Sequence, residues 1–418
     1  MQRMTSAEPE SLYAWLRLAA SLALMTLGGA AMYGVVVVLP AVQAEFGVAR
    51  ADASLPYTLT MIGFGLGGVA MGRLADRYGV MVPALIGTLG LGAGFILSGM
   101  SGTILQFAVA HGLLAGFLGC SATFAPLVAD TSLWFTRRRG IAVAIVISGN
   151  YLAGTVWPPI LQHFFDHAGW RATYIGAGIV LIAVMLPLAL VLRRRPPALG
   201  SANTPGAAPR DERPLGLSPN ALLVLLCIAG VACCVAMSMP QVHIVAYCGD
   251  LGYGAQRGAE MLSVMLGFGI ISRLAFGWIT DRIGGLRTLL LCSALQGIAL
   301  MLFLPFDGLV SLFVVSALFG LFQGGIVPAY PIIVREFFSP REAGTKVAIV
   351  LMATLLGMAL GGWLSGAIFD LTGSYRAAFL NGIGWNLLNL TIAFWLLRRS
   401  LGQPPLATIP RTVNSTSR

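Results

Sequence analysis

The chain has 418 residues, of which 57% are hydrophobic and only 10% are charged. Soluble domains carry about 25% charged residues, so this composition excludes a water-exposed surface of the ordinary kind and, with it, a soluble enzyme. The net charge of +10 would also suit a nucleic-acid-binding protein, but the positions of the basic residues argue against a nucleic-acid partner.

Twelve apolar runs, each about 20 residues long or more, predict twelve helices that cross a lipid bilayer. The N-terminal six are 14–39, 54–72, 81–99, 103–129, 140–163 and 172–193. The C-terminal six are 220–247, 258–280, 286–305, 309–334, 344–370 and 377–397. We number them as spans 1 to 12. Pro158, Pro159, Pro328 and Pro331 are expected to kink spans 5 and 10.

The spans divide the chain into four predicted segments of an all-α membrane protein. Residues 1–193 form an N-terminal six-helix bundle, and residues 220–397 form a C-terminal one. Between them, residues 194–219 are rich in Pro, Ala and Arg, which is typical of a flexible linker. Residues 398–418 form a tail.

The basic residues predict the orientation in the membrane. Of the 26 Lys and Arg residues, only Arg50, Arg171, Arg257 and Arg376 fall in the loops on one side, and Arg273 lies within a span. The remaining 21 lie on the other side, which also holds both termini. Cytoplasmic loops carry such an excess, so we expect both termini in the cytoplasm. This asymmetry explains the net charge without nucleic acid.

The two halves repeat each other at an offset of 205 residues. GRLADRYG at Gly72–Gly79 matches GWITDRIG at Gly277–Gly284, and WRATY at Trp170–Tyr174 matches YRAAF at Tyr375–Phe379. Parallel repeats of six helices predict two bundles related by an axis along the membrane normal. Proteins built in this way bind a ligand between the bundles near the midplane and rock to alternate access.

At these residues the chain resembles the major facilitator superfamily over essentially its full length. Gly72–Gly79 matches the superfamily's signature loop between spans 2 and 3, and Gly277–Gly284 is its second copy. Residues 132–160 and the arginine of GIISRLAFGWITDR are similar to bacterial monocarboxylate and oxalate/formate porters. The resemblance implies the major facilitator fold, a transport function and a place in a bacterial inner membrane.

Arg273 is the strongest candidate for a substrate-binding residue. It lies roughly 20 Å below the outer end of span 8 at about 1.5 Å per residue, where a charge costs at least about 2.5–3.5 kcal/mol. All 16 Asp and Glu residues can be placed at loops or span ends, so none neutralises it at that depth. An anionic substrate could supply the missing charge. The alternative is that Arg273 extends toward the inner surface, where Asp281 lies eight residues on.

Other polar residues of the spans are candidates for the same site. The imidazole of His243 in span 7 could carry a coupling proton or contact substrate, or it could be bonded at the membrane interface. Five further residues could line a cavity, although such residues more often hold helices together. These are Tyr33, Asn150, Tyr151, Gln323 and Tyr330.

The repeated loops predict a conformational latch. Charges between short-looped helices can bridge neighbouring helices in one conformation and release them in another. A solvated hairpin loop is the alternative. The latch residues are Gly72, Asp76, Arg77, Gly277, Asp281 and Arg282.

The sequence gives little support for nucleotide, metal or cofactor binding. Residues 63–68 read GFGLGG, but they lie inside span 2 and follow no strand, so they do not predict dinucleotide binding. No Gly-Lys-Ser/Thr occurs, which argues against nucleotide-driven pumping, and no metal-ligand spacing or cofactor motif is seen. The six cysteines fit small buried apolar residues. They are Cys120, Cys227, Cys233, Cys234, Cys248 and Cys292.

The sequence therefore predicts a secondary transporter of a small organic anion, coupled to proton symport or to exchange with a counter-anion. The chain lacks the mid-membrane lysine that the resembled oxalate porter carries in span 11. One deep guanidinium neutralises one carboxylate, so monocarboxylates are expected to be preferred over dianions. Two alternatives remain: efflux of a drug-like or other small metabolite, and a sensor or channel that transports nothing against a gradient.

Overall fold

The computed structural model describes residues 10–135, 138–194 and 214–401. Within them, twelve helical segments are long and apolar enough to cross a membrane, which confirms the predicted all-α membrane fold. Most of the predicted linker and nearly all of the predicted tail lie outside the described residues.

The N-terminal half contains spans 1 to 6, three of which are built from more than one helix. Its helices are α1 (Leu12–Gly28) and α2 (Ala30–Phe46) in span 1, α3 (Arg50–Ala53) and α4 (Leu55–Tyr78) in span 2, α5 (Met81–Gly99) in span 3, α6 (Ile104–Ala110), η1 (His111–Cys120) and α7 (Ala125–Trp134) in span 4, α8 (Arg139–Ala168) in span 5 and α9 (Trp170–Val191) in span 6.

The C-terminal half also contains six spans, of which one is built from two helices. It contains the short turn η2 (Pro214–Gly216), then α10 (Pro219–Asp250) in span 7, α11 (Ala255–Ile283) in span 8, α12 (Gly285–Leu302) in span 9, α13 (Leu309–Gln323) and α14 (Ile326–Phe337) in span 10, α15 (Pro340–Thr372) in span 11 and α16 (Tyr375–Leu401) in span 12.

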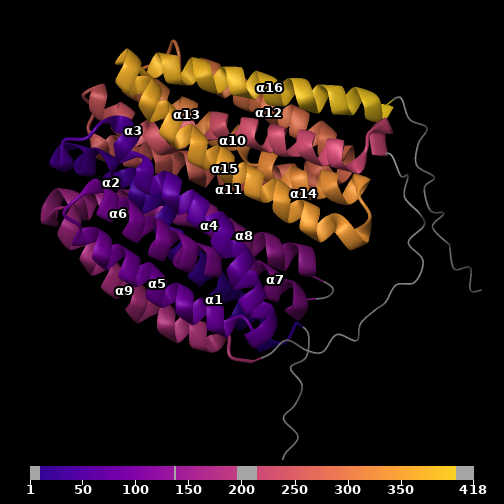
Figure 1. The fold of residues 1–418 in the computed structure, drawn as a ribbon, viewed down its shortest axis with the longest axis horizontal. Helices are drawn as coiled ribbons and strands as arrows, with labels where there is room; N and C mark the ends of the chain where they lie inside the picture. Colours follow the sequence, from indigo (N-terminus) through magenta and orange to yellow (C-terminus); the bar gives the residue numbers. More distant parts are fainter. Residues whose placement is uncertain (1–9, 136–137, 195–213, 402–418) are drawn as a thin grey trace, which may run out of the picture.

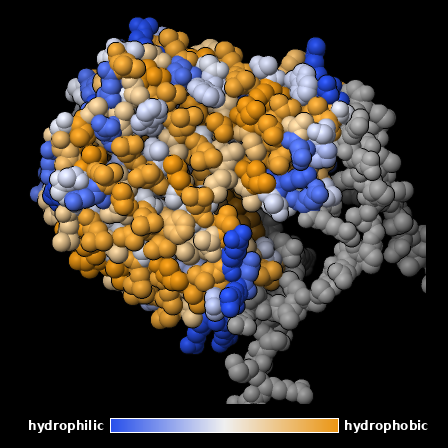
Figure 2. All heavy atoms as spheres, in the orientation of Figure 1, coloured by the Kyte–Doolittle hydropathy of each residue, from blue (hydrophilic) through white to orange (hydrophobic). Residues whose placement is uncertain are grey.

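The two halves lie side by side as two layers of roughly parallel helices (Figure 1). They meet mainly where α8 packs on α11 and where α4 packs on α15, with a smaller contact between α2 and α10. Apolar side chains cover the broad middle of the visible face, and hydrophilic side chains gather toward its margins (Figure 2). This pattern is expected of a surface that faces lipid. We call the end that carries the loops 47–49 and 251–254 the outer end, after the predicted orientation.

Span 10 is broken at Gly324 and Gly325, between α13 and α14. Pro328 follows Gly324 by four residues, and because proline has no N–H it cannot bond the Gly324 carbonyl. The predicted kink of span 10 coincides with this two-residue break between α13 and α14. In span 5, by contrast, α8 continues through Pro158 and Pro159.

The two copies of the repeated loop end their helices in the same way. Gly79 and Gly284, the last residues of each copy, have φ of 86° and 83°. Only glycine adopts such values without strain, so both chains turn away from the helix at the same point. This explains why both copies end in glycine at the same spacing.

A buried ion pair joins span 1 to span 4. The Arg17 guanidinium donates to both carboxylate oxygens of Asp130, at 2.8 Å each, and stacks on the ring of Trp134. The two side chains are only 2% and 6% exposed. Sequence analysis placed Asp130 at the end of its span without a partner, because 113 residues separate the pair.

Replacing Asp130 by Ala is expected to destabilise the N-terminal half by about 3–5 kcal/mol, because it leaves the Arg17 charge buried and unpaired. The midpoint of thermal unfolding in detergent measures this loss. Glu342→Ala is the matched control, since the Glu342 side chain is 60% exposed in its pair with Lys346 and pairs at the surface contribute about 0–1 kcal/mol. Equal midpoints for the two variants would contradict the prediction.

Candidate functional site

Four of the residues predicted to line a site meet at the interface between the two halves. The guanidinium carbon of Arg273, on α11, lies 4.1 Å from the centre of the Tyr151 ring, on α8. The Tyr33 hydroxyl, on α2, donates to Oδ1 of Asn150 at 3.2 Å. We call Arg273, Tyr33, Asn150 and Tyr151 the central cluster.

The break in span 10 positions Arg273. The backbone N–H of Gly324 donates to the Ser272 hydroxyl at 3.1 Å. A Cβ on Gly324 would lie only 2.9 Å from the backbone nitrogen of Arg273. Ser272 is fully buried by this contact, so the neighbouring Arg273 faces the other half. One turn earlier, Gly269 leaves room for the Tyr151 ring, which lies 3.5 Å from where its Cβ would be. The Tyr151 ring therefore lies across this turn of α11.

Arg273 has no anionic partner in the part of the chain that the structure describes. It belongs to none of the five ion pairs there, including none with Asp281. Its Nε is buried without a hydrogen-bond acceptor among those residues, and the side chain as a whole is half-buried. Among the described residues, the Tyr151 ring is the one group that faces this deep guanidinium with negative electrostatic potential.

Gln323 and Tyr330 make their contacts inside the C-terminal half. The Nε2 group of Gln241 donates to Oε1 of Gln323 at 3.2 Å. The Tyr330 hydroxyl lies 3.5 Å from Oδ1 of Asn389 and is fully buried. These contacts hold spans 7, 10 and 12 together, so they match the packing role that was the alternative in the sequence.

The halves are bridged at the outer end by Arg50, which begins α3. Its guanidinium donates to the Asp250 carboxylate at 3.0 and 3.3 Å and also to the Tyr375 hydroxyl. Its backbone N–H donates to Asp370 at 2.8 Å, and the Phe369 ring lies 4.6 Å from its guanidinium carbon. We call Arg50, Asp250, Asp370 and Tyr375 the outer bridge.

The outer bridge was not predicted from the sequence, in which Arg50 is one of four basic residues in the outer loops. Basic residues are rare on that side of the membrane, and this rarity was the feature of the sequence that could have indicated a structural role for Arg50. Its partners could not be read from the chain, since Asp250 is 200 residues away and Asp370 is 320.

His243 contacts the outer bridge rather than the central cluster. Its Nδ1 lies 3.4 Å from the Tyr375 hydroxyl, and its Nε2 lies 2.8 Å from the carbonyl oxygen of Gly362 in span 11. The ring is fully buried. The structure thus connects His243 to Arg50 through Tyr375.

At the opposite end, the two signature loops make no ion pair with other described residues. Asp76 and Asp281 are exposed. The guanidinium groups stack on neighbours in their own helices, Arg77 on Tyr78 and Arg282 on Trp278. A Cβ added to Gly72 or Gly277 would meet nothing within 4 Å, so neither glycine is in close contact with a neighbouring helix.

The latch prediction has a direct test in Asp76→Asn. We expect uptake to slow by about tenfold while equilibrium substrate affinity changes little, because a charge-assisted hydrogen bond contributes about 1.5–3 kcal/mol to the state in which it forms. Uptake rate and equilibrium binding are measured on the same preparation, with Asp281→Asn as the equivalent change in the second copy. Normal uptake by both variants would remove the latch.

Comparison with known proteins agrees with this architecture. The family model for the Major Facilitator Superfamily matches residues 20–311 and 251–412. Monocarboxylate transporter 13 of Bos taurus is 27% identical over 339 residues, which cover 78% of this chain and 75% of that protein. The MFS-type transporter opdF of Penicillium oxalicum is 25% identical over 341 residues, covering 79% of this chain and 77% of that protein.

Solved structures share the fold at low identity. A mutant of the nucleoside transporter NupG superposes with a TM-score of 0.72 at 15% identity, covering 93% of this chain and 100% of that one. A bacterial homologue of the human lysosomal transporter Spinster superposes with a TM-score of 0.71, also at 15% identity, covering 95% of this chain. Twelve membrane-length helices in two repeated halves and the match to the family model lead to one conclusion: the chain belongs to the Major Facilitator Superfamily of membrane transporters and is not an enzyme.

Proposed function

We propose that the protein is a secondary active transporter of a small organic anion, namely a monocarboxylate. The observation that carries the proposal is the deep, half-buried guanidinium of Arg273, which has no acidic partner in the described chain. Its planar fork matches a carboxylate with two parallel hydrogen bonds. Relatives named monocarboxylate transporters, at 27% identity, support the same substrate class.

Transport by alternating access is supported by the contrast between the two ends of the interface. The outer bridge joins the halves at one end, whereas the signature loops at the other end make no ion pair with described residues. The visible face is also hollowed where the halves separate at that second end (Figure 2). In the proposed orientation, with both termini in the cytoplasm of a bacterium and the chain in its inner membrane, this conformation opens inward.

Coupling to a proton or to a counter-anion completes the proposal. Because His243 contacts Tyr375 of the outer bridge, a proton bound there would act on the bridge between the halves. Alternatively, the proton could travel on the substrate, since a carboxylate can be carried as its acid. Exchange with a second anion needs no protonated side chain at all.

Uptake by proteoliposomes tests the proposal. Vesicles containing the purified protein are offered labelled small monocarboxylates, either with an inward proton gradient or with unlabelled anion inside. Accumulation above the external concentration supports secondary transport, and the condition that drives it distinguishes symport from exchange. Efflux of drug-like compounds predicts instead that transport survives Arg273→Ala, and a channel or sensor predicts no accumulation against a gradient.

A further inference from the structure

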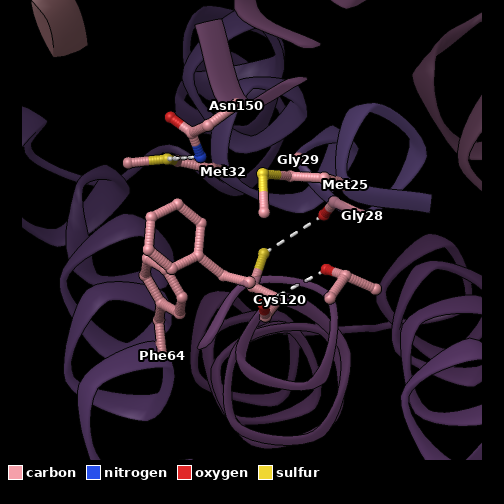
Figure 3. Close-up of a pocket in the computed structure, with 9 residues that line it drawn as sticks. Met25, Gly28, Gly29, Met32, Phe64, Cys120 and Asn150 are labelled. Atoms are coloured by element: carbon pink, nitrogen blue, oxygen red, sulfur yellow. Dashed lines mark hydrogen bonds between the residues drawn. The ribbon is translucent and has the colours of Figure 1, made fainter. Parts of the chain in front are cut away.

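A small cavity in the N-terminal half opens beside the central cluster. Figure 3 shows it between spans 1, 2, 4 and 5. Its lining consists mainly of thioether, thiol and phenyl groups and glycine backbone, with no charged side chain, and its polar side chains are Asn150 and Thr123. The lining residues are Met25, Gly28, Gly29, Met32, Phe64, Cys120, Thr123, Phe124 and Asn150.

Two interrupted helices create this cavity. Span 1 breaks at Gly29, between α1 and α2, and span 4 breaks at Thr123 and Phe124, before α7. Cys120 donates from its thiol to the Gly28 carbonyl at 3.2 Å, which satisfies an oxygen that the break leaves without a helical partner. Interrupted helices near the midplane commonly form the binding sites of transporters.

The cavity and Arg273, which lies on α11, both contact the same turn of α8. Asn150 accepts the Tyr33 hydrogen bond and points its Nδ2 at the Met32 sulfur, at 3.8 Å (Figure 3). The next residue, Tyr151, carries the ring on which Arg273 stacks. A bound molecule whose anionic end pairs with Arg273 could therefore extend past Tyr151 and Asn150 into the apolar cavity.

The cavity is small and its walls cannot easily separate or close. It has room for about one water- or methyl-sized group. Span 1 contacts its neighbours directly through glycine, because a Cβ on Gly28 would collide with Thr123 and one on Gly29 would collide with Ala153. On the far wall, Phe64 and Phe124 pack edge to face with ring centres 5.5 Å apart. A group too long for the cavity therefore finds little room to displace these walls.

From this geometry we infer that the cavity is the tail subsite of the substrate: it takes the terminal apolar group of a short monocarboxylate whose carboxylate pairs with Arg273. The inference rests on the proposed function and adds selection by length and by polarity of the tail. A second carboxylate would lie against sulfur and phenyl groups that cannot solvate it, and the Thr123 hydroxyl already donates to backbone carbonyls of its own helix. The subsite is thus a second, independent reason for rejecting dianions.

Cys120 gives the most direct test, because its side chain lines the cavity. Inhibition of labelled lactate uptake is measured with 2-hydroxy acids that keep one head group and lengthen the tail from one carbon to five. In the wild type we expect inhibition to strengthen about fourfold for each added carbon, up to an optimum, and then to weaken. Cys120→Ala should move the optimum about one carbon longer, and Cys120→Val should move it shorter.

Cys248→Ala is the matched control. It removes the same atom from an equally buried thiol that lies outside the cavity, so it should leave the optimum unchanged. An identical length dependence in all four proteins overturns the tail subsite while leaving the anion site standing. If no carboxylate of any length inhibits uptake and lactate itself is not transported, the proposed function fails and the subsite fails with it.

Discussion

Arg273→Ala is expected to lower carboxylate uptake by at least about 100-fold. The substrate would lose two hydrogen bonds to a charged group, each contributing about 1.5–3 kcal/mol, and the central cluster contains no second cation among the described residues. The protein itself should fold at least as well, because the variant removes a charge that has no anionic partner in the described structure. Uptake in proteoliposomes, normalised to the amount of reconstituted protein, measures the effect.

Arg273→Lys should be nearly as poor although it keeps the charge. An ammonium group cannot form the two parallel bonds of the guanidinium fork, and it stacks less well on the Tyr151 ring. This variant separates the geometric requirement from simple attraction of anions. Wild-type uptake by the lysine variant would mean that Arg273 acts only as a distant positive charge.

The same site predicts selection by valence. In the wild type, 2-hydroxybutyrate should inhibit lactate uptake more strongly than malate, which keeps the head group but ends in a second carboxylate. The competition is run at a pH where all carboxylates are ionised. Stronger inhibition by malate, or full activity of Arg273→Ala, would overturn this description of the site.

Arg50→Ala is expected to shift the protein toward the conformation that is open at the outer end. The change removes the side-chain bonds to Asp250 and Tyr375, which join the halves only when that end is closed. Energetic couplings of this kind amount to about 1–3 kcal/mol, which corresponds to a 5- to 150-fold change in the ratio of the two conformations. Turnover should fall as well, because the outer end must close in every cycle.

Spin labels at the outer end, at Val48 and at the exposed Gly249 near the end of α10, report this equilibrium as a distance. The labels are introduced in a background without the six native cysteines. Arg257→Ala is the matched control, since it removes another outer arginine whose only described ion pair is with Glu260 on its own helix. If Arg50→Ala and Arg257→Ala give the same distance distribution as the unchanged protein, the outer bridge does not hold the halves together.

The sequence by itself determined the class of the protein and much of its plan. Membrane spans follow from runs of apolar residues, and the repeat follows from matched motifs, so neither depends on which helices touch. The depth of Arg273 is also a local property of span 8. Because the positions of all 16 acids can be read from the chain, the absence of a deep neutralising acid was predictable before any contact was known.

Only the tertiary structure decided which side chains meet. Packing decides which face of each helix meets a neighbouring helix. It places Tyr33, Asn150 and Tyr151 in one cluster with Arg273, whereas the Tyr330 hydroxyl bonds within its own half. The outer bridge joins residues 200 and 320 positions apart, a pairing that no local pattern encodes. His243 shows the same limit: its place in span 7 was predictable, but its contact with Tyr375 depends on how spans 7 and 12 pack.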